Sequence, residues 1–467
     1  MPTSAADVDV DVVVVGGGPA GLAAAGVAAG AGTVALVDAG GELGGQYWRR
    51  PADGGPVTAH LYHGLDRAEA ARARVDSLGV RVLRRHHVQT IAPVDGGWVL
   101  HCVVGADPTV SGRTVRVRGR RVVVATGTHD RVLPFPGWTR PGVMTAGGVQ
   151  ALLKSTGVVA GSRVVVAGSG PLLLPVAAGL LAAGAAVPAV VESANPLHWA
   201  TQLPAAVSAG AKLGEAAGYA RRLAAGRTRL LSRSAVVEAI GTDRVTGVRV
   251  ARLDGWGHPV PGSEREVACD VLAVGWGFTA QLDLALQAGC ATHLGADGGL
   301  ALDVDADQRT TVPGVWAAGE VTGIGGADLS EVEGEIAGLT ATGRRPGRRL
   351  LARRTRLRRF AAAVHAVYPF PTALLDDLRP DTVVCRCEEV TAAEVAEARE
   401  VWGATDVRSV KGLTRTGMGW CQGRICGPAT CALVTGTPRH DDLLVFARRP
   451  NAVPSPLHTV ADLEPSD

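Results

Sequence analysis

The 467-residue sequence lacks several features that point to common protein classes. Its N-terminus, MPTSAADVDV, has no basic segment ahead of an apolar one, so we expect no secretory signal peptide and a cytoplasmic location. The formal net charge is only +3, which by itself indicates neither a nucleic-acid partner nor a membrane-surface partner. The chain is also too long for one ordinary domain, and two or three domains are expected.

Two long uncharged runs, 12–37 and 164–191, lack the composition of membrane helices. Their interiors contain GGGPAG in the first run, and GSGPLLLP and Pro188 in the second. A proline inside a helix costs ~3 kcal/mol. Each run instead follows the order of a valine-rich strand, Gly-x-Gly, a small-residue helix, a second strand and an acid. We therefore predict two buried βαβ units and no membrane span.

The first unit has the pattern of a dinucleotide-binding fingerprint. Gly16 permits the tight turn, Gly18 lets a pyrophosphate approach the backbone, and Gly21 lets the helix pack closely on the strand. The positive end of that helix faces the phosphates. Asp38 ends the second strand, where a carboxylate accepts hydrogen bonds from ribose hydroxyls. The predicted contacts are Gly16, Gly18, Pro19, Ala20, Gly21 and Asp38.

The second unit departs from this fingerprint at one position. It keeps Gly168, Gly170 and the terminal acid Glu192, but Leu173 stands where the third glycine is expected. A leucine there should push the helix slightly off its strand and narrow the site. Two interpretations stay open, namely a Rossmann-shaped domain that binds no nucleotide and a site for NAD. Glu192 favours NAD over NADP in the second case, because a carboxylate suits a free ribose diol.

Three further stretches indicate that the first nucleotide is FAD. GGELGGQYW follows Asp38, RRVVVATGTHDR is a strand ending in Thr-Gly, and TTVPGVWAAGEVTG is a late strand ending in Gly-Glu. Their order resembles that of the two-dinucleotide-domain flavoproteins, the glutathione-reductase and thioredoxin-reductase superfamily. The resemblance implies that the Gly-Glu pair meets the ribitol and phosphates, and that the Thr-Gly pair closes over the flavin. It adds these contacts to the site: Gly44, Gly45, Gln46, Thr126, Gly127, Gly319 and Glu320.

A redox cysteine pair beside the flavin is missing. No cysteine lies near GGQYWRR, and none lies between Cys102 and Cys269. The disulfide reductases of this superfamily need such a pair, so we exclude that activity. Electrons must leave the flavin by another carrier.

The close cysteine pairs of the chain lie near its C-terminus, in VVCRCEEV and GMGWCQGRICG. Four thiolates suit an iron–sulfur cluster or zinc. The C-x-C and C-x4-C layout resembles the bacterioferritin-associated-ferredoxin-like module, a small helical fold that holds a 2Fe-2S cluster. Thr391 and Glu394 have the spacing of a capping box for its first helix, and Cys431 is expected to be a buried neighbour. The predicted cluster ligands are Cys385, Cys387, Cys421 and Cys426, with structural zinc or simple buried thiols as alternatives.

The stretch 133–157, LPFPGWTRPGVMTAGGVQALLKSTG, narrows the family when it is taken together with GSGPLLLPVAAGLL and the cysteine module. The three resemble the FAD and 2Fe-2S subunits of multi-subunit amine dehydrogenases, among them the corresponding chain of opine oxidase, the alpha chains of proline and hydroxyproline dehydrogenases, and the middle subunit of hydrogen cyanide synthase. The resemblance implies that an amino acid or secondary amine is oxidised on a D-amino-acid-oxidase-like flavoprotein partner. This chain relays the electrons, and a small third subunit fits the same picture.

The expected fold class is α/β, with two Rossmann-like dinucleotide-binding domains and a small helical 2Fe-2S module. We predict an FAD-binding domain at 9–150 and 270–343, a second nucleotide-type domain at 151–269, a basic helical linker at 344–380, the 2Fe-2S module at 381–447 and an extended tail at 448–467. The linker has apolar residues at helical spacing opposite a basic face. A nucleic-acid or lipid patch is one interpretation of that face, and the one we favour is a solvated face that docks an acidic partner surface.

No arrangement of side chains typical of acid–base or nucleophilic catalysis stands out in the sequence. Catalysis is therefore expected to be centred on the flavin, with unknown catalytic side chains. An alternative function stays open, in which NADH reduces the flavin directly and the cluster passes the electrons outward without a dehydrogenase partner.

Overall fold

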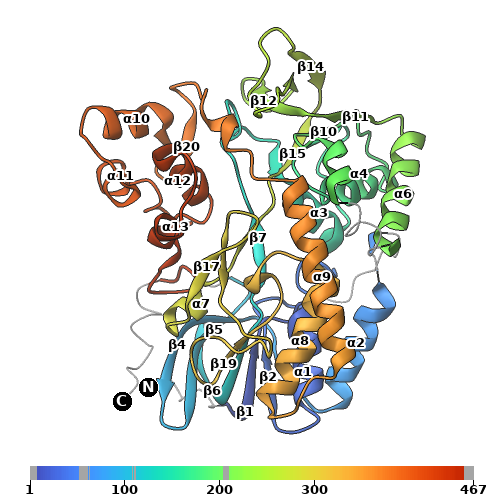
Figure 1. Ribbon diagram of the computed structural model, residues 1–467, viewed down its shortest axis with the longest axis vertical. Coiled ribbons are helices and arrows are strands. Elements are labelled where there is room, and N and C mark those ends of the chain that lie inside the picture. The colour runs from blue at the N-terminus through green and yellow to red at the C-terminus, as the bar shows by residue number, and fades with distance from the viewer. Residues whose placement is uncertain are drawn as a thin grey trace.

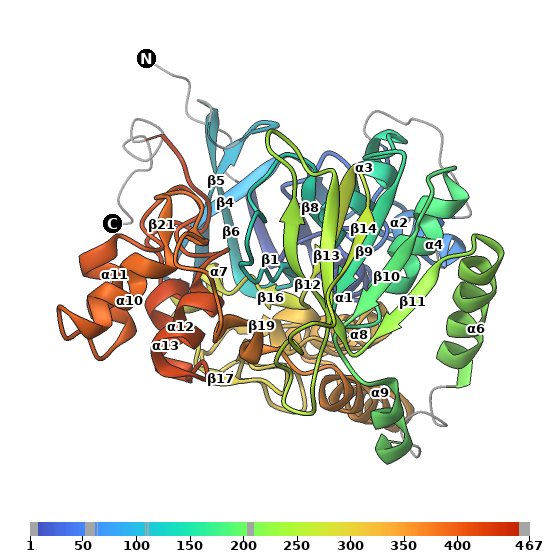
Figure 2. The same ribbon diagram turned by 90° about the horizontal axis from the view of Figure 1, so that it is seen from above.

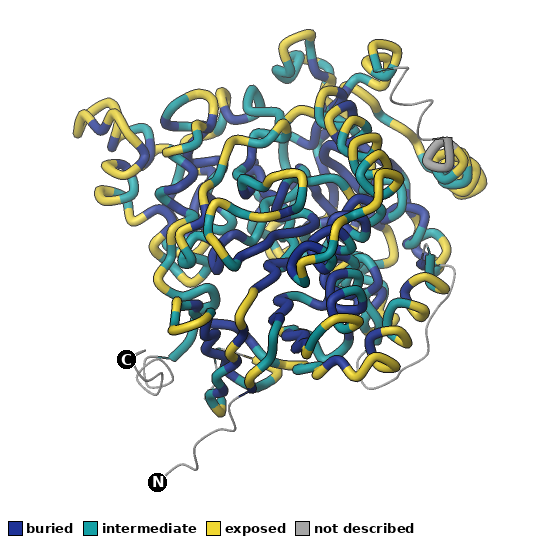
Figure 3. The backbone as a smooth tube through the Cα atoms, turned by 60° about the horizontal axis from the view of Figure 1, so that its bottom comes forward, coloured by how far each residue is buried: buried dark blue, intermediate teal, exposed yellow. Residues whose placement is uncertain are grey.

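The computed structural model describes residues 8–51, 61–62, 64–107, 109, 112–202 and 210–456. Figure 1 shows three parts: a blue-to-cyan sheet at the bottom, a green region at the upper right and orange-to-red helices at the upper left. Buried backbone gathers in the inner strands, and exposed backbone lies on the outer helices and loops (Figure 3). Among the described residues, no helix is long and apolar enough to cross a membrane.

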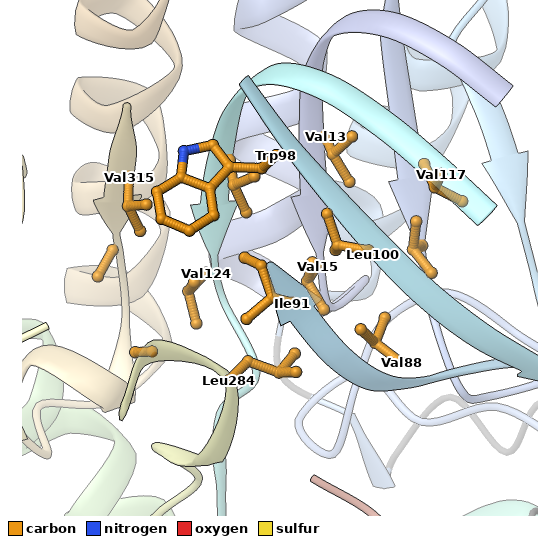
Figure 4. Packing of buried hydrophobic residues seen from close by; sticks show 14 of the residues in the cluster. Val13, Val15, Val88, Ile91, Trp98, Leu100, Val117, Val124, Leu284 and Val315 are labelled. Atoms are coloured by element: carbon orange, nitrogen blue, oxygen red, sulfur yellow. The ribbon is translucent and has the colours of Figure 1, made fainter. Parts of the chain in front are cut away.

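The first sheet combines a parallel half with an antiparallel half. Its parallel strands run in the order β3-β2-β1-β6, with β19 on the far side of β6, and β5 and β4 continue from the N-terminal part of β6. Its core contains Val13, Val15, Trp98 and Leu284, which point toward one another in Figure 4. The strands are β1 (Val8–Val15), β2 (Val34–Val37), β3 (Arg81–Leu83), β4 (His86–Val94), β5 (Gly97–Val104), β6 (Arg113–Val124) and β19 (Val315–Ala317).

Glycines allow the helices on this sheet to pack closely. α1 (Pro19–Ala28) lies against α8 (Ala327–Ala341), and a Cβ added at Gly334 or Gly338 would overlap carbonyl oxygens of α1. α2 (Leu65–Ser77) and the basic α9 (Arg348–Val367) flank the pair (Figure 1). The linker therefore forms the helix that its apolar spacing predicts, with its leucine, phenylalanine and valine side chains at least half-buried.

The second sheet is parallel, in the order β11-β10-β9-β15-β8. Two of its strands, β8 and β15, lie outside the segment 151–269 that was expected to form the second domain. The chain passes between the two domains at the ribbon of β7 (Thr128–Asp130) and β16 (Phe278–Ala280). The sheet strands are β8 (Val143–Thr145), β9 (Val164–Gly168), β10 (Ala189–Glu192), β11 (Arg229–Ser232) and β15 (Val271–Gly275), with helices α3 (Ala146–Thr156), α4 (Leu173–Ala182) and α6 (Gly210–Ala225).

Smaller elements complete this region. A meander of β12 (Ser234–Ile240), β13 (Gly247–Arg252) and β14 (Arg265–Ala268) covers the second sheet. The remaining short elements are η3 (Pro196–Gln202), α7 (Asp283–Gln287), β17 (Thr292–Leu294), β18 (Leu300–Leu302), η4 (Glu320–Thr322) and η5 (Thr372–Leu375).

The C-terminal module packs on both domains. Ala429 and Ala432 belong to the core cluster of the second domain, and the Trp138 Nε1–H donates to the Val383 carbonyl at 2.6 Å. The predicted capping box of Thr391 and Glu394 is present. The module contains β20 (Val383–Cys385), β21 (Val390–Thr391), α10 (Ala392–Glu400), α11 (Val407–Thr414), α12 (Gly427–Thr435) and α13 (His440–Ala447).

The tail after α13 turns toward the first domain of the same chain. The Ala452 N–H donates to the Gln89 carbonyl at 2.9 Å, and Gln287 Nε2–H donates to the Pro450 carbonyl at 3.1 Å. In Figure 2 the module lies on the same side of the molecule as β4 and β5, and Figure 1 shows it above these strands. Residues 457–467 of the predicted extended tail lie outside the described residues.

Candidate cofactor sites

A cavity of about 1640 Å³ lies where the two domains and the C-terminal module meet. Both Gly-rich loops border it, and so do α3, the C-terminal half of α9 and the loop after Cys421. Parallel strands place their carboxyl ends at one edge of a sheet, which brings residues far apart in the sequence to this cavity. Among the cavity residues that the structure describes, Cys421 is the only cysteine.

The first Gly-rich loop is shaped to leave space beside Gly18. Gly16 has φ of +104°, and a Cβ there would overlap the Ala125 carbonyl. A Cβ at Gly21 would overlap the Gly16 carbonyl, so the helix lies directly on the strand end. At Gly18 the nearest atom to an added Cβ is Gly45 Cα at 3.8 Å. The backbone of Gly18 is therefore open to a ligand in the cavity.

Asp38 closes this loop from the end of β2. Its carboxylate accepts hydrogen bonds from the Gly17 N–H and, at 2.6 Å, from the Gly40 N–H. Burial raises the pKa of Asp38 above its ordinary value, against the lowering effect of these hydrogen bonds. The carboxylate thus holds the loop in shape and borders the cavity.

Most of the FAD contacts predicted from the sequence border the cavity. Gly21, Gly44 and Gly319 lie behind its wall, where a Cβ on each would press on neighbouring atoms. The predicted contacts that line the cavity are Gly16, Gly18, Pro19, Ala20, Asp38, Gly45, Gln46, Thr126, Gly127 and Glu320.

Glu320 points toward the start of α8. Its carboxylate accepts from the Gly326 N–H at 2.7 Å and weakly from the Gly325 N–H. Burial raises the pKa of Glu320 to about 7 in spite of these bonds. Behind it, the buried Glu333 pairs with Arg358 at 2.5 Å. The resemblance implies that Glu320 contacts the ribitol and phosphates of FAD. In the structure its carboxylate already accepts hydrogen bonds from backbone N–H groups.

The residues present fit a ligand of the FAD type. Several buried polar atoms of cavity-lining side chains have no hydrogen-bond partner: His129 Nδ1, Asp130 Oδ1 and Trp276 Nε1. Buried polar atoms are normally paired, so these atoms indicate a bound group with polar edges. The open backbone at Gly18 and Gly127 supplies the close approach that a pyrophosphate and a flat ring need.

The second Gly-rich loop repeats part of this arrangement. Glu192 accepts from the Gly170 N–H at 3.0 Å and from the Ala194 N–H at 2.9 Å, as Asp38 does in the first unit. Burial raises the pKa of Glu192 to about 7. α4 begins at Leu173, after a turn at Pro171, whereas α1 begins directly after Gly18. Gly170 lines the cavity, and Gly168 and Glu192 do not.

The cysteines of the two pairs lie together in the module. Hydrogen bonds with the Cys426 thiol lower the pKa of Cys385 to about 6 and that of Cys421 to about 5. The same contacts raise the pKa of Cys426, while burial raises the pKa of Cys387, whose thiol contacts Cys421. Thiolates are the form that binds iron, so this donor set fits a cluster. Cys431 is fully buried, as expected of a neighbour.

The four thiols contact one another, since Cys426 contacts Cys385 and Cys421, and Cys421 contacts Cys387. Within the described part of the chain, no group of three or more His, Cys, Asp or Glu side chains is placed to hold one metal ion. A 2Fe-2S cluster needs two thiolates at each of two irons, whereas structural zinc needs four donors around one point. The Gly417 N–H also donates to Cys385 Sγ at 3.4 Å, as backbone amides do around cluster sulfurs.

Sequence reasoning missed several polar residues at the junction of module and cavity. His129 lies in the quoted stretch RRVVVATGTHDR, but nothing in its spacing assigns it a contact. Asp283, Arg424 and Arg449 form a buried ion-pair cluster from distant parts of the chain. Lys154 is also buried at the cavity wall, where burial lowers its pKa to about 8.

Comparisons with known proteins agree along nearly the whole chain. The family model described as pyridine nucleotide-disulphide oxidoreductase matches residues 10–337, and the BFD-like 2Fe-2S binding domain matches residues 383–435. Hydrogen cyanide synthase subunit HcnB of Pseudomonas aeruginosa is 34% identical over 447 residues, covering 92% of this chain and 94% of that protein. An opine oxidase subunit of Rhizobium meliloti is 33% identical over 477 residues, covering 97% of this chain and 98% of that protein.

A solved structure shows the same fold over the full length. The crystal structure of L-proline dehydrogenase from P. horikoshii matches with a TM-score of 0.68 at 20% identity, covering 98% of this chain and 80% of that one.

Proposed function

We propose, since this chain belongs to the pyridine nucleotide-disulphide oxidoreductase family and carries a BFD-like 2Fe-2S binding domain, that it is the electron-relaying subunit of an amine or amino-acid dehydrogenase. FAD and a 2Fe-2S cluster are the cofactors that the two matches imply. The substrate would be oxidised on a D-amino-acid-oxidase-like flavoprotein partner, and a small third subunit is compatible with this assembly.

One observation carries this proposal: a cluster-type cysteine, Cys421, borders the flavin-type cavity where a disulfide reductase would need a cysteine pair. Cys421 contacts Cys426 and Cys387, so the thiol that borders the cavity belongs to the group of predicted cluster ligands. Its position instead suits an iron–sulfur cluster that exchanges electrons with the flavin.

The names of the relatives support a proposal for the substrate class. The two curated relatives described above are named as subunits of hydrogen cyanide synthase and opine oxidase, and the solved relative is an L-proline dehydrogenase. We therefore propose proline, hydroxyproline, an opine or glycine as the class of compound oxidised by the complex. The word subunit in both names supports a partner chain for this protein also.

The residues of this chain bind, orient and shield the cofactors. The open backbone at Gly18 and the carboxylate of Asp38 would hold the pyrophosphate and ribose ends of FAD. α9 and the tail after α13 form part of the cavity wall. When bound, FAD supplies two-electron exchange with an organic donor and one-electron exchange with the cluster.

Partner dependence tests this function. The chain purified alone should not dehydrogenate proline, hydroxyproline, sarcosine or opines with an artificial dye as acceptor. It should gain that activity when combined with the flavoprotein subunit that copurifies with it. Full activity of the isolated chain on any of these amines would contradict the relay assignment.

A second candidate function is an NADH-dependent flavin reductase that sends electrons out through the cluster. The observation that favours it is Glu192, which ends β10 and accepts a hydrogen bond from the second Gly-rich loop, as Asp38 at the end of β2 does from the first. Rapid bleaching of the flavin by NADH without a partner would support this function. Glu192→Ala should then weaken NADH binding, and an unchanged affinity would leave the second domain as a scaffold.

A further inference from the structure

A buried ion-pair cluster ties the cysteine module to the first domain. Asp283 Oδ1 accepts from Arg424 Nη2 at 2.9 Å and from Arg449 Nη1 at 2.7 Å. The Asp283 side chain is only 7% exposed, and both arginines are largely buried. Breaking such a buried pair by removing one partner leaves an unpaired charge and is strongly destabilising. We refer to Asp283, Arg424 and Arg449 as the charge clamp.

The charge clamp is anchored in a rigid part of the fold. Asp283 begins α7, and the next residue, Leu284, is packed into the core of the first sheet (Figure 4). The two arginines come from the opposite side, one from the cysteine loop and one from the tail after α13. The clamp thus joins the core of the first domain to the module.

The two arginines also hold the backbone of the cysteine loop. Arg424 Nη1–H donates to the Cys421 carbonyl at 3.3 Å, and Arg449 Nε–H donates to the Gln422 carbonyl at 3.0 Å. Arg424 Nη2–H further donates to the Ala452 carbonyl at 2.6 Å, which binds the tail into the same network. The loop from Cys421 onward is therefore fixed by charged donors that are themselves fixed by Asp283.

His129 links this loop to the cavity. The ring Nε2 lies 3.1 Å from the Arg424 carbonyl, so Nε2 carries the hydrogen and Nδ1 keeps a lone pair in the neutral ring. That Nδ1 is buried without a partner, and His129 lines the cavity. One side chain on the interdomain ribbon therefore contacts the cysteine loop through Nε2 and also lines the cavity.

We propose that His129 and the charge clamp fix the separation between flavin and cluster, so that electrons pass within this chain without movement of the module. The inference rests on the proposed function for its two cofactors. In the step, one electron leaves the reduced flavin with a proton released to solvent, and one ferric iron of the cluster becomes ferrous. No covalent bond to sulfur forms or breaks. His129 is a positioning residue in this step.

The rate of internal electron transfer tests the proposal on the full chain loaded with FAD and cluster. After photoreduction of the flavin, reduction of the cluster is followed by absorbance and by electron paramagnetic resonance of frozen samples. His129→Phe should slow the transfer about tenfold, equivalent to about 1.4 kcal/mol in the barrier, when the two proteins are compared at equal FAD and iron content. His129→Gln, which keeps a donor for the Arg424 carbonyl, should restore most of the rate.

The reduction potential of the cluster gives a second readout that does not depend on turnover. Arg449→Gln removes a positive charge that is bonded to the cysteine loop, so it should lower the midpoint potential and slow the transfer. Arg379→Gln is the matched control, because Arg379 pairs with Glu238 at 3.0 Å on the outer side of the second domain. This control should leave both the rate and the potential unchanged.

Equal transfer rates in His129→Phe and the unsubstituted chain, at equal cofactor content, would overturn the inference. If His129→Phe loses a cofactor, the comparison of Arg449→Gln with Arg379→Gln decides: identical rates and potentials would overturn it too. Failure of the proposed function looks different, because it appears as missing amine oxidation with the partner while internal transfer stays sensitive to His129.

Discussion

Replacing Gly18 with valine should remove FAD binding while leaving the apoprotein folded. Gly18 has φ of −74° and ψ of −173°, an extended conformation that any residue adopts. The nearest atom to an added Cβ is 3.8 Å away, which is ordinary van der Waals contact. A non-glycine residue at a compatible position stabilises a fold by about 0.4–1 kcal/mol through the unfolded chain. The apoprotein should therefore melt at the same temperature or slightly higher.

The expected loss is visible in the stabilisation that FAD confers. A ligand present at 100 times its dissociation constant adds about 2.7 kcal/mol to stability. With about 2–4 °C per kcal/mol for domains of a few hundred residues, FAD should raise the melting temperature by about 5–10 °C. The side chain of Gly18→Val would occupy the space of the pyrophosphate, so this rise should vanish in the variant, and the purified protein should be colourless.

Gly21→Ala is the matched control on the same loop. Its Cβ would overlap the Gly16 carbonyl, so this variant should lower the melting temperature of the apoprotein itself. Overpacking of this kind typically costs about 1–3 kcal/mol. Thermal unfolding with and without FAD, together with flavin absorbance, separates the two effects. Full FAD occupancy in Gly18→Val would show that the cofactor lies elsewhere.

Two further predictions concern the cluster and the pH dependence. The chain should contain two irons and two labile sulfides, in keeping with a 2Fe-2S centre, and give a signal in electron paramagnetic resonance after dithionite reduction. Cys421→Ser should lose this signal, and Cys431→Ser should keep it. About one zinc per chain without the signal would refute the assignment of a cluster. Burial raises the pKa of Glu320 from 4.5 to about 7, so the folded apoprotein binds more protons than the unfolded chain in this window, and its stability should fall as pH rises through it. Glu320→Gln should flatten this fall in melting scans, and an identical pH profile would argue against a buried carboxyl.

Local patterns made much of the molecule predictable from the sequence. The family matches over 10–337 and 383–435 confirm the expected oxidoreductase family, the α/β fold and the 2Fe-2S module. The Gly-x-Gly turns, the amphipathic α9 and the capping box at Thr391 depend on neighbours within a few residues. Such features are encoded in short spacings, which explains why they could be identified.

The rest depends on contacts between distant segments. The chain crosses between domains at the ribbon of β7 and β16, because β8 pairs with β15 across more than a hundred residues of sequence. Asp283 and Arg449 are also more than a hundred residues apart in the sequence, and no sequence spacing predicts that they form an ion pair. The orientation of Glu320 toward Gly326 could not be predicted either, since a Gly-Glu pair does not specify the N–H groups from which its carboxylate accepts hydrogen bonds.

The second nucleotide-type domain has a structural role whether or not it binds NADH. Ala429 and Ala432 of the module pack into the core of that domain, and the Val383 carbonyl of the module accepts a hydrogen bond from Trp138. The charge clamp joins the module to the first domain. The domain is thus one of two supports that hold the cysteine loop at the cavity. The proposed relay needs this support with or without a bound nucleotide, because electron transfer depends on the separation of the two cofactors. Loss of NADH binding alone would therefore not make the domain dispensable, and changes at its contact with α12 should impair the relay even with Glu192 intact.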